Sequence, residues 1–264
     1  MKGRRSTLLI AIAVLLLSIR PAHADQPSAA AVAAFDAYVT AVEARMARQH
    51  SSTQDFLVLN SATRARLRQG EVLVQRLTPP NRGVVPGGLI HDWGASAFVP
   101  AAKAEDVLSL LRDYQRYPAV FSPQVAQARV LSERADDVQV ALRLRQHHVL
   151  TVVLDTDYDV AFSRPDAEHV ASFSRSTRIA EIASPGARGE HALSPADDHG
   201  FLWRLDTWWS AEQADGGVYL QVESVSLTRS IPTGLAWIVG PYIESVPRES
   251  LEFTLHSVCR ALRP

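Results

Sequence analysis

Strand-length stretches separated by turn residues fill the second half of the chain, and they constrain the fold more than any other feature. Turn signals such as Arg164-Pro165-Asp166 and Asp215-Gly216-Gly217 separate most of these stretches. A run of alternating or apolar residues between turns is typical of a strand. The pattern predicts about six antiparallel strands, near residues 125–132, 137–147, 149–162, 169–182, 201–211 and 218–229.

Helical patterns precede these strands. Apolar residues recur at helical spacing in an alanine-rich stretch and predict a helix over residues 27–50. A loop with one helical turn is expected over 51–69, and a strand over Glu71–Leu77. A further strand is expected from Leu89, followed by an amphipathic helix over 102–111 and a short second helix.

The last part of the chain predicts one long helix. Pro247 suits a first helical turn. The apolar stripe that follows consists of Leu251, Leu255, Val258 and Leu262. Cys259, the only cysteine, lies beside this stripe near the end of the helix. A catalytic thiol needs a cationic neighbour at a helix start, so Cys259 is expected to be a small buried apolar residue.

This order of elements resembles the START-like, or SRPBCC, superfamily, which includes Bet v 1-type pollen allergens, polyketide cyclases and lipid-transfer domains. The stretches that carry the resemblance are HDWGASAFVPA leading into EDVLSLLRDYQRYPAVF, the paired strands VQVALRLRQHHVLTVVLDTDYDV, and IPTGLAWIVGPYIESVPRESLEFTL. The resemblance implies an α+β helix-grip fold, in which a curved antiparallel sheet of six to seven strands wraps around the C-terminal helix. It also implies a cavity between sheet and helix, usually for an apolar molecule.

Three regions are expected along the chain: a signal peptide over 1–24, an N-terminal helical extension and linker over 25–87, and a START-like ligand-binding domain over 88–264. The signal peptide has a basic start, MKGRR, a short apolar run and a small-residue cleavage pattern that ends at Ala24. The apolar run is too short for a comfortable bilayer span, and no cysteine follows the cleavage site for a lipid anchor. We therefore expect cleavage after Ala24, a periplasmic or secreted protein, and no stable membrane anchor.

Charge argues against a nucleic-acid partner. Loss of the four basic residues of the signal peptide reduces the 27 Lys and Arg to 23, against 28 Asp and Glu, so the formal charge is near −5. No basic cluster marks a nucleic-acid surface.

Aromatic residues are candidates for the wall of the cavity. In the strand FLWRLDTWWS, alternation places Trp203, Leu205 and Trp209 on the inner face. Core packing is the expected role of Trp203, and Trp209 is the candidate for the cavity wall. Trp208 falls on the opposite face, where an exposed ring is expected to mark a protein interface.

Two further pairs of residues are ligand-binding candidates. Tyr117 and Phe121 are candidates for a portal, because the equivalent helix pair often gates the cavity in the resembled superfamily, or they simply hold that helix on the sheet. Leu154 and Tyr158 alternate with Asp155, Asp157 and Asp159, which are expected to form cross-strand ion pairs with Arg143 and Arg145 on a solvent face.

Polar candidates come from two strands whose faces the sequence leaves open. In strand 169–182, either Ser174, Ser176 and Arg178 or Phe173, Arg175 and Thr177 point inward. A buried arginine needs an acidic partner, and Glu223 and Glu181 are the candidates. The turn at residues 215–217 fits both a two-residue and a bulged three-residue form, so the inner face of 218–229 also stays open.

No motif indicates a metal, a cofactor or nucleophilic catalysis. Asp155, Asp157 and Asp159 have the spacing of a calcium loop, but Val160 stands where that loop requires glycine. A Gly-x-Ser-x-Gly elbow is missing from the sequence. We therefore predict no metal, no cofactor and no catalytic residue.

The sequence thus favours an exported carrier of a hydrophobic small molecule, such as a lipid, an isoprenoid or a polyketide-like compound, over an enzyme. One alternative is a cyclase- or hydrolase-like enzyme, for which an inward Arg175 or Arg178 bound to a cavity acid would be the sign. Another is a cell-envelope protein-interaction module without a ligand, with a partner on the N-terminal helix or the Trp208 face.

Overall fold

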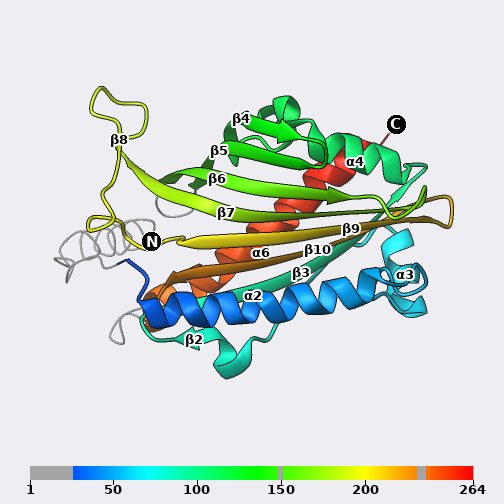
Figure 1. Cartoon of the computed structure of the whole chain (residues 1–264), viewed down its shortest axis with the longest axis horizontal. Coiled ribbons are helices and arrows are strands. Elements are labelled where there is room, and N and C mark those ends of the chain that lie inside the picture. The colour runs from blue at the N-terminus through cyan, green and yellow to red at the C-terminus, as the bar shows by residue number, and fades with distance from the viewer. Residues whose placement is uncertain (1–25, 148–150, 231–235, 264) are drawn as a thin grey trace, which may run out of the picture.

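A computed structural model describes residues 26–147, 151–230 and 236–263, of which residues 236–244 are described by backbone only. Its centre is an open antiparallel sheet with the order β1-β3-β10-β9-β7-β6-β5-β4 (Figure 1). The strands are β1 (Leu73–Leu77), β3 (Gly88–Pro100), β4 (Val125–Arg134), β5 (Asp137–His147), β6 (Thr151–Ser163), β7 (His169–Ala183), β9 (Arg204–Ala214) and β10 (Gly217–Arg229). Two short strands, β2 (Val84–Val85) and β8 (His191–Ala192), pair with β3 and β7.

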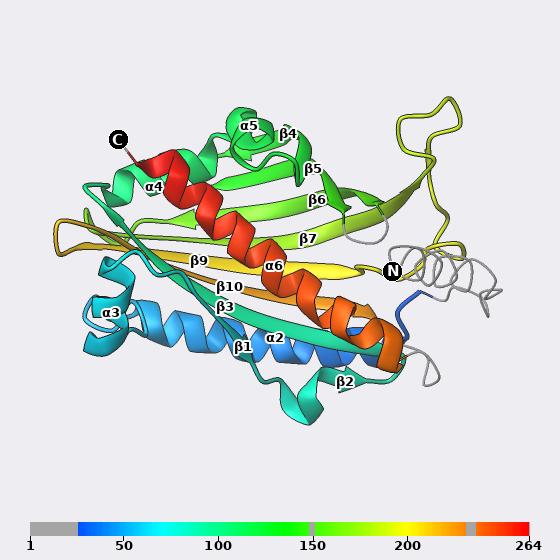
Figure 2. The same cartoon turned by 180° about the vertical axis from the view of Figure 1, so that it is seen from behind.

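Helices lie on both faces of this sheet. The long helix α6 (Ala236–Leu262) crosses one face diagonally, and we call that face the inner face (Figure 2). The helix α2 (Ala29–His50) lies along the opposite, outer face (Figure 1). The remaining helices are α3 (Ser61–Arg68), η1 (Pro80–Gly83), α4 (Ala104–Arg112), η2 (Tyr114–Arg116) and α5 (Tyr117–Val120). This is the predicted helix-grip architecture with an N-terminal helix.

The turn between β9 and β10 decides which side chains face inward. Ala214 pairs with Gly217, so Asp215 and Gly216 form a two-residue turn. Both have positive φ, 52° and 76°, as a tight hairpin turn requires. Val218, Leu220 and Val222 of β10 consequently lie in the main core on the inner face. That core also contains Leu251, Leu255 and Val258 of α6, which confirms the predicted apolar stripe.

A second core lies between α2 and the outer face. Phe35, Val39, Val42 and Met46 of α2 pack in one cluster with Trp208, Val225 and Leu227. Trp208 is only 4% exposed, and its ring stacks on Phe173 with 4.9 Å between centroids. The expectation of an exposed Trp208 is therefore wrong. Strand alternation predicted its face correctly, but the helix that covers this face is distant in sequence.

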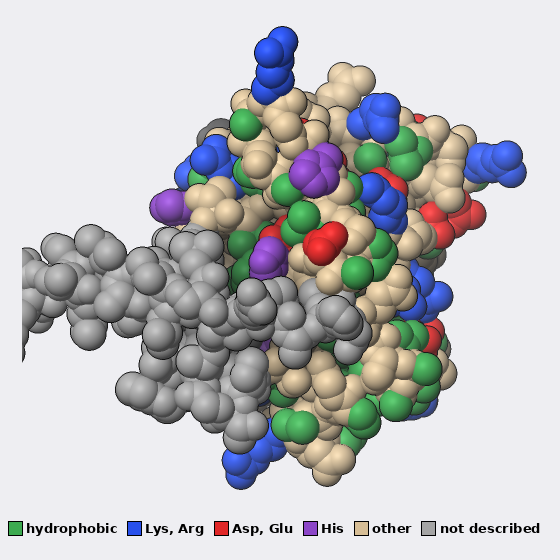
Figure 3. All heavy atoms as spheres, turned by 90° about the vertical axis from the view of Figure 1, so that its left-hand side faces the viewer, with side chains coloured by type: hydrophobic (Ala, Val, Ile, Leu, Met, Phe, Trp, Pro, Cys, Tyr) green, Lys and Arg blue, Asp and Glu red, His purple; other side chains and the backbone are tan. Residues whose placement is uncertain are grey.

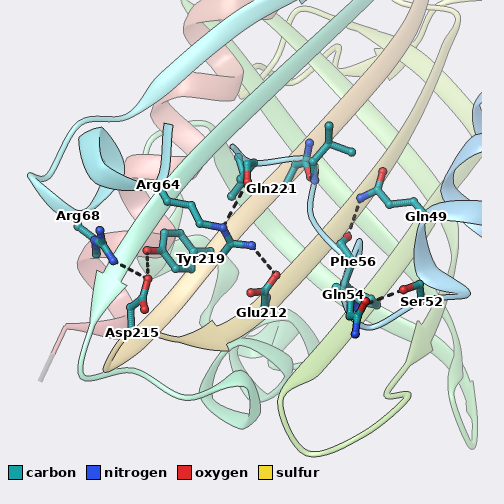
Figure 4. Close-up of polar contacts among 12 residues, drawn as sticks. Gln49, Ser52, Gln54, Phe56, Arg64, Arg68, Glu212, Asp215, Tyr219 and Gln221 are labelled. Atoms are coloured by element: carbon teal, nitrogen blue, oxygen red, sulfur yellow. Dashed lines mark hydrogen bonds and ion pairs between the residues drawn. The ribbon is translucent and has the colours of Figure 1, made fainter. Parts of the chain in front are cut away.

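The segment between α2 and β1 is fixed to the outer face by polar contacts (Figure 4). Arg64 of α3 forms a 2.9 Å ion pair with Glu212 and lies over the ring of Tyr219, 4.5 Å from its centroid. Arg68 contacts Asp215 at 2.6 Å, and Tyr219 donates a hydrogen bond of 2.6 Å to the same carboxylate. The segment predicted as a loop with one helical turn is thus an ordered connection that contains an eight-residue helix.

Two other boundaries differ from the prediction. α6 begins at Ala236, so Pro247 lies inside the helix and not in its first turn. An interior proline costs a helix roughly 3 kcal/mol, and the buried residues that follow Pro247 offset this cost by anchoring α6 to the core. In addition, β1 pairs with β3 from Leu73 to Leu77, so part of the predicted extension belongs to the sheet.

Candidate functional site

The middle of the inner face keeps side chains within reach of solvent. α6 comes nearest to β3 and β1 and to the short helices α4 and α5 (Figure 2). Several inward-facing residues of the central strands are half-buried, whereas their neighbours toward the α4 end, and also Ser176 and Ser226, are buried. We define the inner-face site by its half-buried residues: Trp93, Leu142, Ser174, Leu205, Thr207, Trp209 and Ser224.

A shallow apolar hollow lies beside the inner-face site, under α4. Its volume is about 220 Å³, including the solvent at its mouth, and it is too shallow to enclose a water molecule. The residues around it include Val107 and Leu111 of α4, Phe162 of β6, Val170 of β7 and Trp209 of β9. Trp209, the aromatic residue expected at the cavity wall, lies at the edge of this hollow, which has no room for a water molecule.

Five of the predicted ligand-binding residues lie on the inner side of the sheet. Trp209 is in the inner-face site, and Tyr158 and Phe121 are buried in the main core. Leu154 is buried and faces inward from β6, as does Thr156 two residues later. Tyr117 packs against the same core and donates a hydrogen bond of 2.7 Å to the carbonyl of Leu111. Tyr117 thereby fastens α5 to α4, as expected of a residue that holds the short helices on the sheet.

The other three predicted residues lie on the outer face, under or beside α2. Glu223 forms an ion pair with Arg45 of α2. Arg175 forms a 2.5 Å ion pair with Glu43 of α2. Trp203 packs against the second core, because β9 begins only at Arg204 and strand alternation does not extend back to it.

A β-bulge decides the open question in β7. Ser176 pairs with Tyr158 and Arg178 with Asp157, so Thr177 is an extra residue between them. Ser174 and Ser176 therefore face inward, while the arginines on both sides of the bulge face outward. Arg178 contacts Asp157 at 3.6 Å on the outer side. Arg175 and Arg178, the arginines of the enzyme hypothesis, thus face away from the inner side, whereas Glu181 faces inward from β7.

The outer face holds a buried group of carboxyl side chains that the sequence did not predict as a group. Asp92, Glu223 and Asp206, from β3, β10 and β9, are all buried beneath α2. Tyr38 of α2 donates a hydrogen bond to Asp92, and Arg45 contacts Glu223. Among the described residues, one oxygen each of Asp92 and Asp206 has no hydrogen-bond partner.

Burial shifts the pKa values of this group. Loss of solvation, strengthened by the nearby Glu223 charge, raises the pKa of Asp92 to about 7. Burial raises the pKa of Asp206 to about 6, against the opposing effect of Arg175. Burial also raises the pKa of Glu223, against the effect of Arg45. Asp92 and Asp206 consequently titrate much closer to neutral pH than ordinary aspartates do.

Other predicted residues have structural roles. Cys259 is buried, and burial raises the pKa of its thiol to about 11, as expected of a core residue. Arg143 binds Asp155 through two hydrogen bonds of 2.7 and 2.8 Å, which confirms the predicted cross-strand pair. In the described part of the chain, no three His, Cys, Asp or Glu residues are grouped so that they could hold a metal ion.

The surface shows no dominant charge at the end of the molecule where β8 lies. Basic, acidic, histidine and hydrophobic side chains are interspersed there (Figure 3). Within the described ranges, every helix is too short or too polar to cross a membrane.

Sequence reasoning missed several residues of the inner-face site. Trp93 lies in a stretch whose alternation was not resolved, and Ser224 lies on a strand whose face depended on the turn at Asp215. The alternation of FLWRLDTWWS did place Thr207 and Leu205 inward, and their positions in β9 confirm that face.

Comparison with known proteins finds similarity in structure only. No protein-family model matches the chain, and no curated protein matches it significantly. A STAR-related lipid transfer protein from Xanthomonas axonopodis is 16% identical with a TM-score of 0.47, over 72% of this chain and 99% of that one. The Zhui aromatase/cyclase from Streptomyces sp. R1128 is 16% identical with a TM-score of 0.40, over 65% and 88%. The human StarD13 lipid transfer and protein localization domain is 9% identical with a TM-score of 0.45, over 79% and 100%.

Similarity at this level concerns the fold, because one fold carries many functions. The strand order, the position of α6 across the inner face and the short helices α4 and α5 together give this chain a helix-grip fold.

Proposed function

We propose that the protein binds or carries a hydrophobic small molecule at the inner-face site. The observation that carries this proposal is the incomplete burial of the inward side chains Trp93, Leu142, Leu205 and Trp209. Large apolar side chains on the face of a sheet that a helix covers are normally buried by that helix. Here they remain within reach of solvent, so an apolar molecule could cover them.

Burial of apolar surface is sufficient to drive such binding. Each Å² of apolar surface removed from water contributes roughly 25 cal/mol, so a ligand that buries about 200 Å² gains on the order of 5 kcal/mol before the cost of immobilisation. Arg175, Arg178 and Glu223 face outward, so neither arginine proposed for acid–base chemistry lies at the inner-face site. A carrier function therefore has more support than a cyclase or hydrolase function.

The proposal is tested by filling the site. In Ser224→Phe, a ring replaces a half-buried hydroxyl between β3 and β9, and it should reduce binding of the apolar dye Nile red at least tenfold. Ser163→Phe adds the same ring at an exposed end of β6 and is the matched control. Equal dye binding by both variants and the unmodified protein would place the apolar site elsewhere.

We further propose that the protein is exported and acts outside the cytoplasm. This part rests on residues 1–24, which lie outside the described residues. The mass of the mature protein isolated from its own host should correspond to a chain that begins at Asp25. Native mass spectrometry of the same preparation should detect a co-purified small molecule, and a bare chain after gentle extraction would count against a carrier function.

A further inference from the structure

Three buried carboxyl groups lie close together on the face of the sheet that α2 covers. Asp206 of β9 and Asp92 of β3 are the cross-strand neighbours of Val225 of β10, one on each side. Glu223 lies two residues before Val225 on the same face, so it is the diagonal neighbour of both aspartates, at a spacing of about 7–8 Å. Asp92, Asp206 and Glu223 are 1%, 2% and 3% exposed, and we call them the carboxyl cluster.

The partners of Asp92 and Glu223 come from α2, which lies along this face (Figure 1). Tyr38 donates a hydrogen bond to Oδ2 of Asp92, and Arg45 forms an ion pair with Glu223. Oδ1 of Asp92 has no hydrogen-bond partner among the described residues. On the β1 side, the cross-strand neighbour of Asp92 is Leu77, which carries no charge. Of these two carboxyl groups, only that of Glu223 is therefore neutralised by a direct ion pair.

Asp206 shares its cation with α2. Nε of Arg175 of β7 lies 3.5 Å from Oδ2 of Asp206, but another nitrogen of the same guanidinium lies 2.5 Å from Glu43 of α2. Oδ1 of Asp206 has no hydrogen-bond partner within the described ranges. Two further charges beside the cluster, Asp36 of α2 and Arg204 of β9, pair with each other at 3.9 Å. The docked helix thus leaves two carboxyl oxygens of the cluster unsatisfied, and buried polar groups are normally paired.

Ionisation of the cluster works against the docking of α2. A buried carboxylate without a full set of partners is costly, and neighbouring carboxylates repel each other. Burial and the charge of Glu223 raise the pKa of Asp92 to about 7, and burial raises the pKa of Asp206 to about 6. Separation of α2 from the sheet would expose both groups to water and lower these pKa values. A pKa that is raised in the docked state stabilises that state at low pH, and the stabilisation is lost as the pH rises toward the raised pKa.

His50, the last residue of α2, titrates in the opposite sense. A 2.8 Å hydrogen bond joins its ring Nε2 to Ser210 of β9, and the ring stacks on Phe56 with 4.4 Å between centroids. Burial lowers the pKa of His50. The docked helix therefore favours the neutral ring, and this contribution is lost as the pH falls. Docking of α2 is thus opposed by protonation of His50 at low pH and by ionisation of the carboxyl cluster at higher pH.

We propose that α2 is a pH-controlled cover of the outer face, which is held while the carboxyl cluster carries protons and is loosened when the cluster ionises. The far end of the connection stays attached, because the ion pair of Arg64 of α3 with Glu212 involves no member of the cluster. Release of α2 exposes the apolar surface of the second core, including Trp208 and Val225. The proposal is independent of the carrier function, since the inner-face site lies on the other side of the sheet.

Hydrogen exchange of the α2 backbone amides, corrected for the intrinsic effect of pH on exchange, measures the opening of this helix. Comparison of the unmodified protein with Asp92→Asn isolates the carboxyl group, because both proteins contain His50. The opening constant of the unmodified protein relative to that of Asp92→Asn should rise roughly tenfold to a hundredfold from pH 5 to pH 8. Asp206→Asn should give a change in the same direction.

Asp157→Asn is the matched control, because it makes the same change on the outer face of β6, where the carboxyl group lies 3.6 Å from Arg178. The opening constant relative to this control should be the same at both pH values. Amides of β3 and β10 should stay protected while α2 opens. Exchange of α2 only together with β3 and β10 would show that the helix does not open separately, and this result would overturn the proposal. A ratio to Asp92→Asn that does not change with pH would also overturn it.

Discussion

Tyr38 of α2 donates a hydrogen bond of 2.5 Å to Oδ2 of Asp92 of β3, and this bond joins the N-terminal helix to the buried outer face of the sheet. Asp92 is 1% exposed, and its other oxygen has no partner among the described residues. α2 therefore covers a carboxyl group that is only partly satisfied. The attachment of α2 should depend on the protonation of Asp92.

The first prediction concerns pH. The pKa of Asp92 is raised from 3.8 to about 7, so the stability linked to its proton is fully present below about pH 4 and is lost as the pH rises to 7. Asp92→Asn removes the titration and should stabilise the protein relative to the unmodified chain by about 2 kcal/mol more at pH 8 than at pH 5. Urea unfolding at both pH values measures this difference, and parallel pH profiles would contradict it.

Removal of the Tyr38 hydroxyl should have the opposite dependence on pH. Tyr38→Phe deprives the Asp92 carboxylate of its donor, and hydrogen bonds to charged groups contribute about 1.5–3 kcal/mol. The loss of stability should be larger at pH 8, where the carboxylate is ionised, than at pH 5. An equal loss of stability at both pH values would mean that the contribution of the Tyr38 hydroxyl does not depend on the charge of Asp92.

The two adjacent tryptophans of β9 should separate stability from binding. Trp208 is buried beneath α2, so Trp208→Ala should destabilise the protein by about 3–5 kcal/mol. Trp209 is half-buried in the inner-face site, so Trp209→Ala should cost less stability and more Nile red affinity. Calorimetry and dye titration of both variants check this order, and the reverse order would contradict the assignment of the two faces.

Arg175 provides a test of the enzyme hypothesis. Arg175→Met removes the outward contacts with Glu43 and Asp206 and should lower stability by about 1 kcal/mol, because the pair is half-exposed. Ligand affinity should not change, since the guanidinium lies on the opposite side of the sheet from the inner-face site. A large loss of ligand affinity with normal stability would show that Arg175 takes part in ligand binding.

Much of the fold is encoded locally and could be predicted. The strands β4, β5, β6, β7, β9 and β10 and the helices α2 and α4 follow from periodicity and turn residues. The stripe of Leu251, Leu255 and Val258 identifies the core face of α6. The packing of α2 on the outer face could not be predicted, because it depends on contacts between residues more than 160 positions apart, such as Arg45 with Glu223. Strand alternation therefore predicts the correct face for Trp208 but not its burial beneath α2.

The candidate site was predictable only in part. Alternation placed Trp209, Leu205 and Thr207 inward, but the bulge at Thr177 and the two-residue turn at Asp215 decided the faces of β7 and β10. The bulge and the turn each shift the register by one residue, and such a shift turns every following side chain to the opposite face of the sheet. Glu223 and Arg175 were consequently candidates for a site from which the observed register excludes them.

The most direct test of the account is the location of a bound ligand. Crystals grown with 12-bromo-1-dodecanol allow the bromine to be located by anomalous scattering and the alcohol oxygen by its density. Binding at the inner-face site predicts a chain between α6 and the inner face, in contact with Leu205 or Trp209. A ligand bound on the α2 side of the sheet, or on the outer surface with the inner-face site empty, would contradict it.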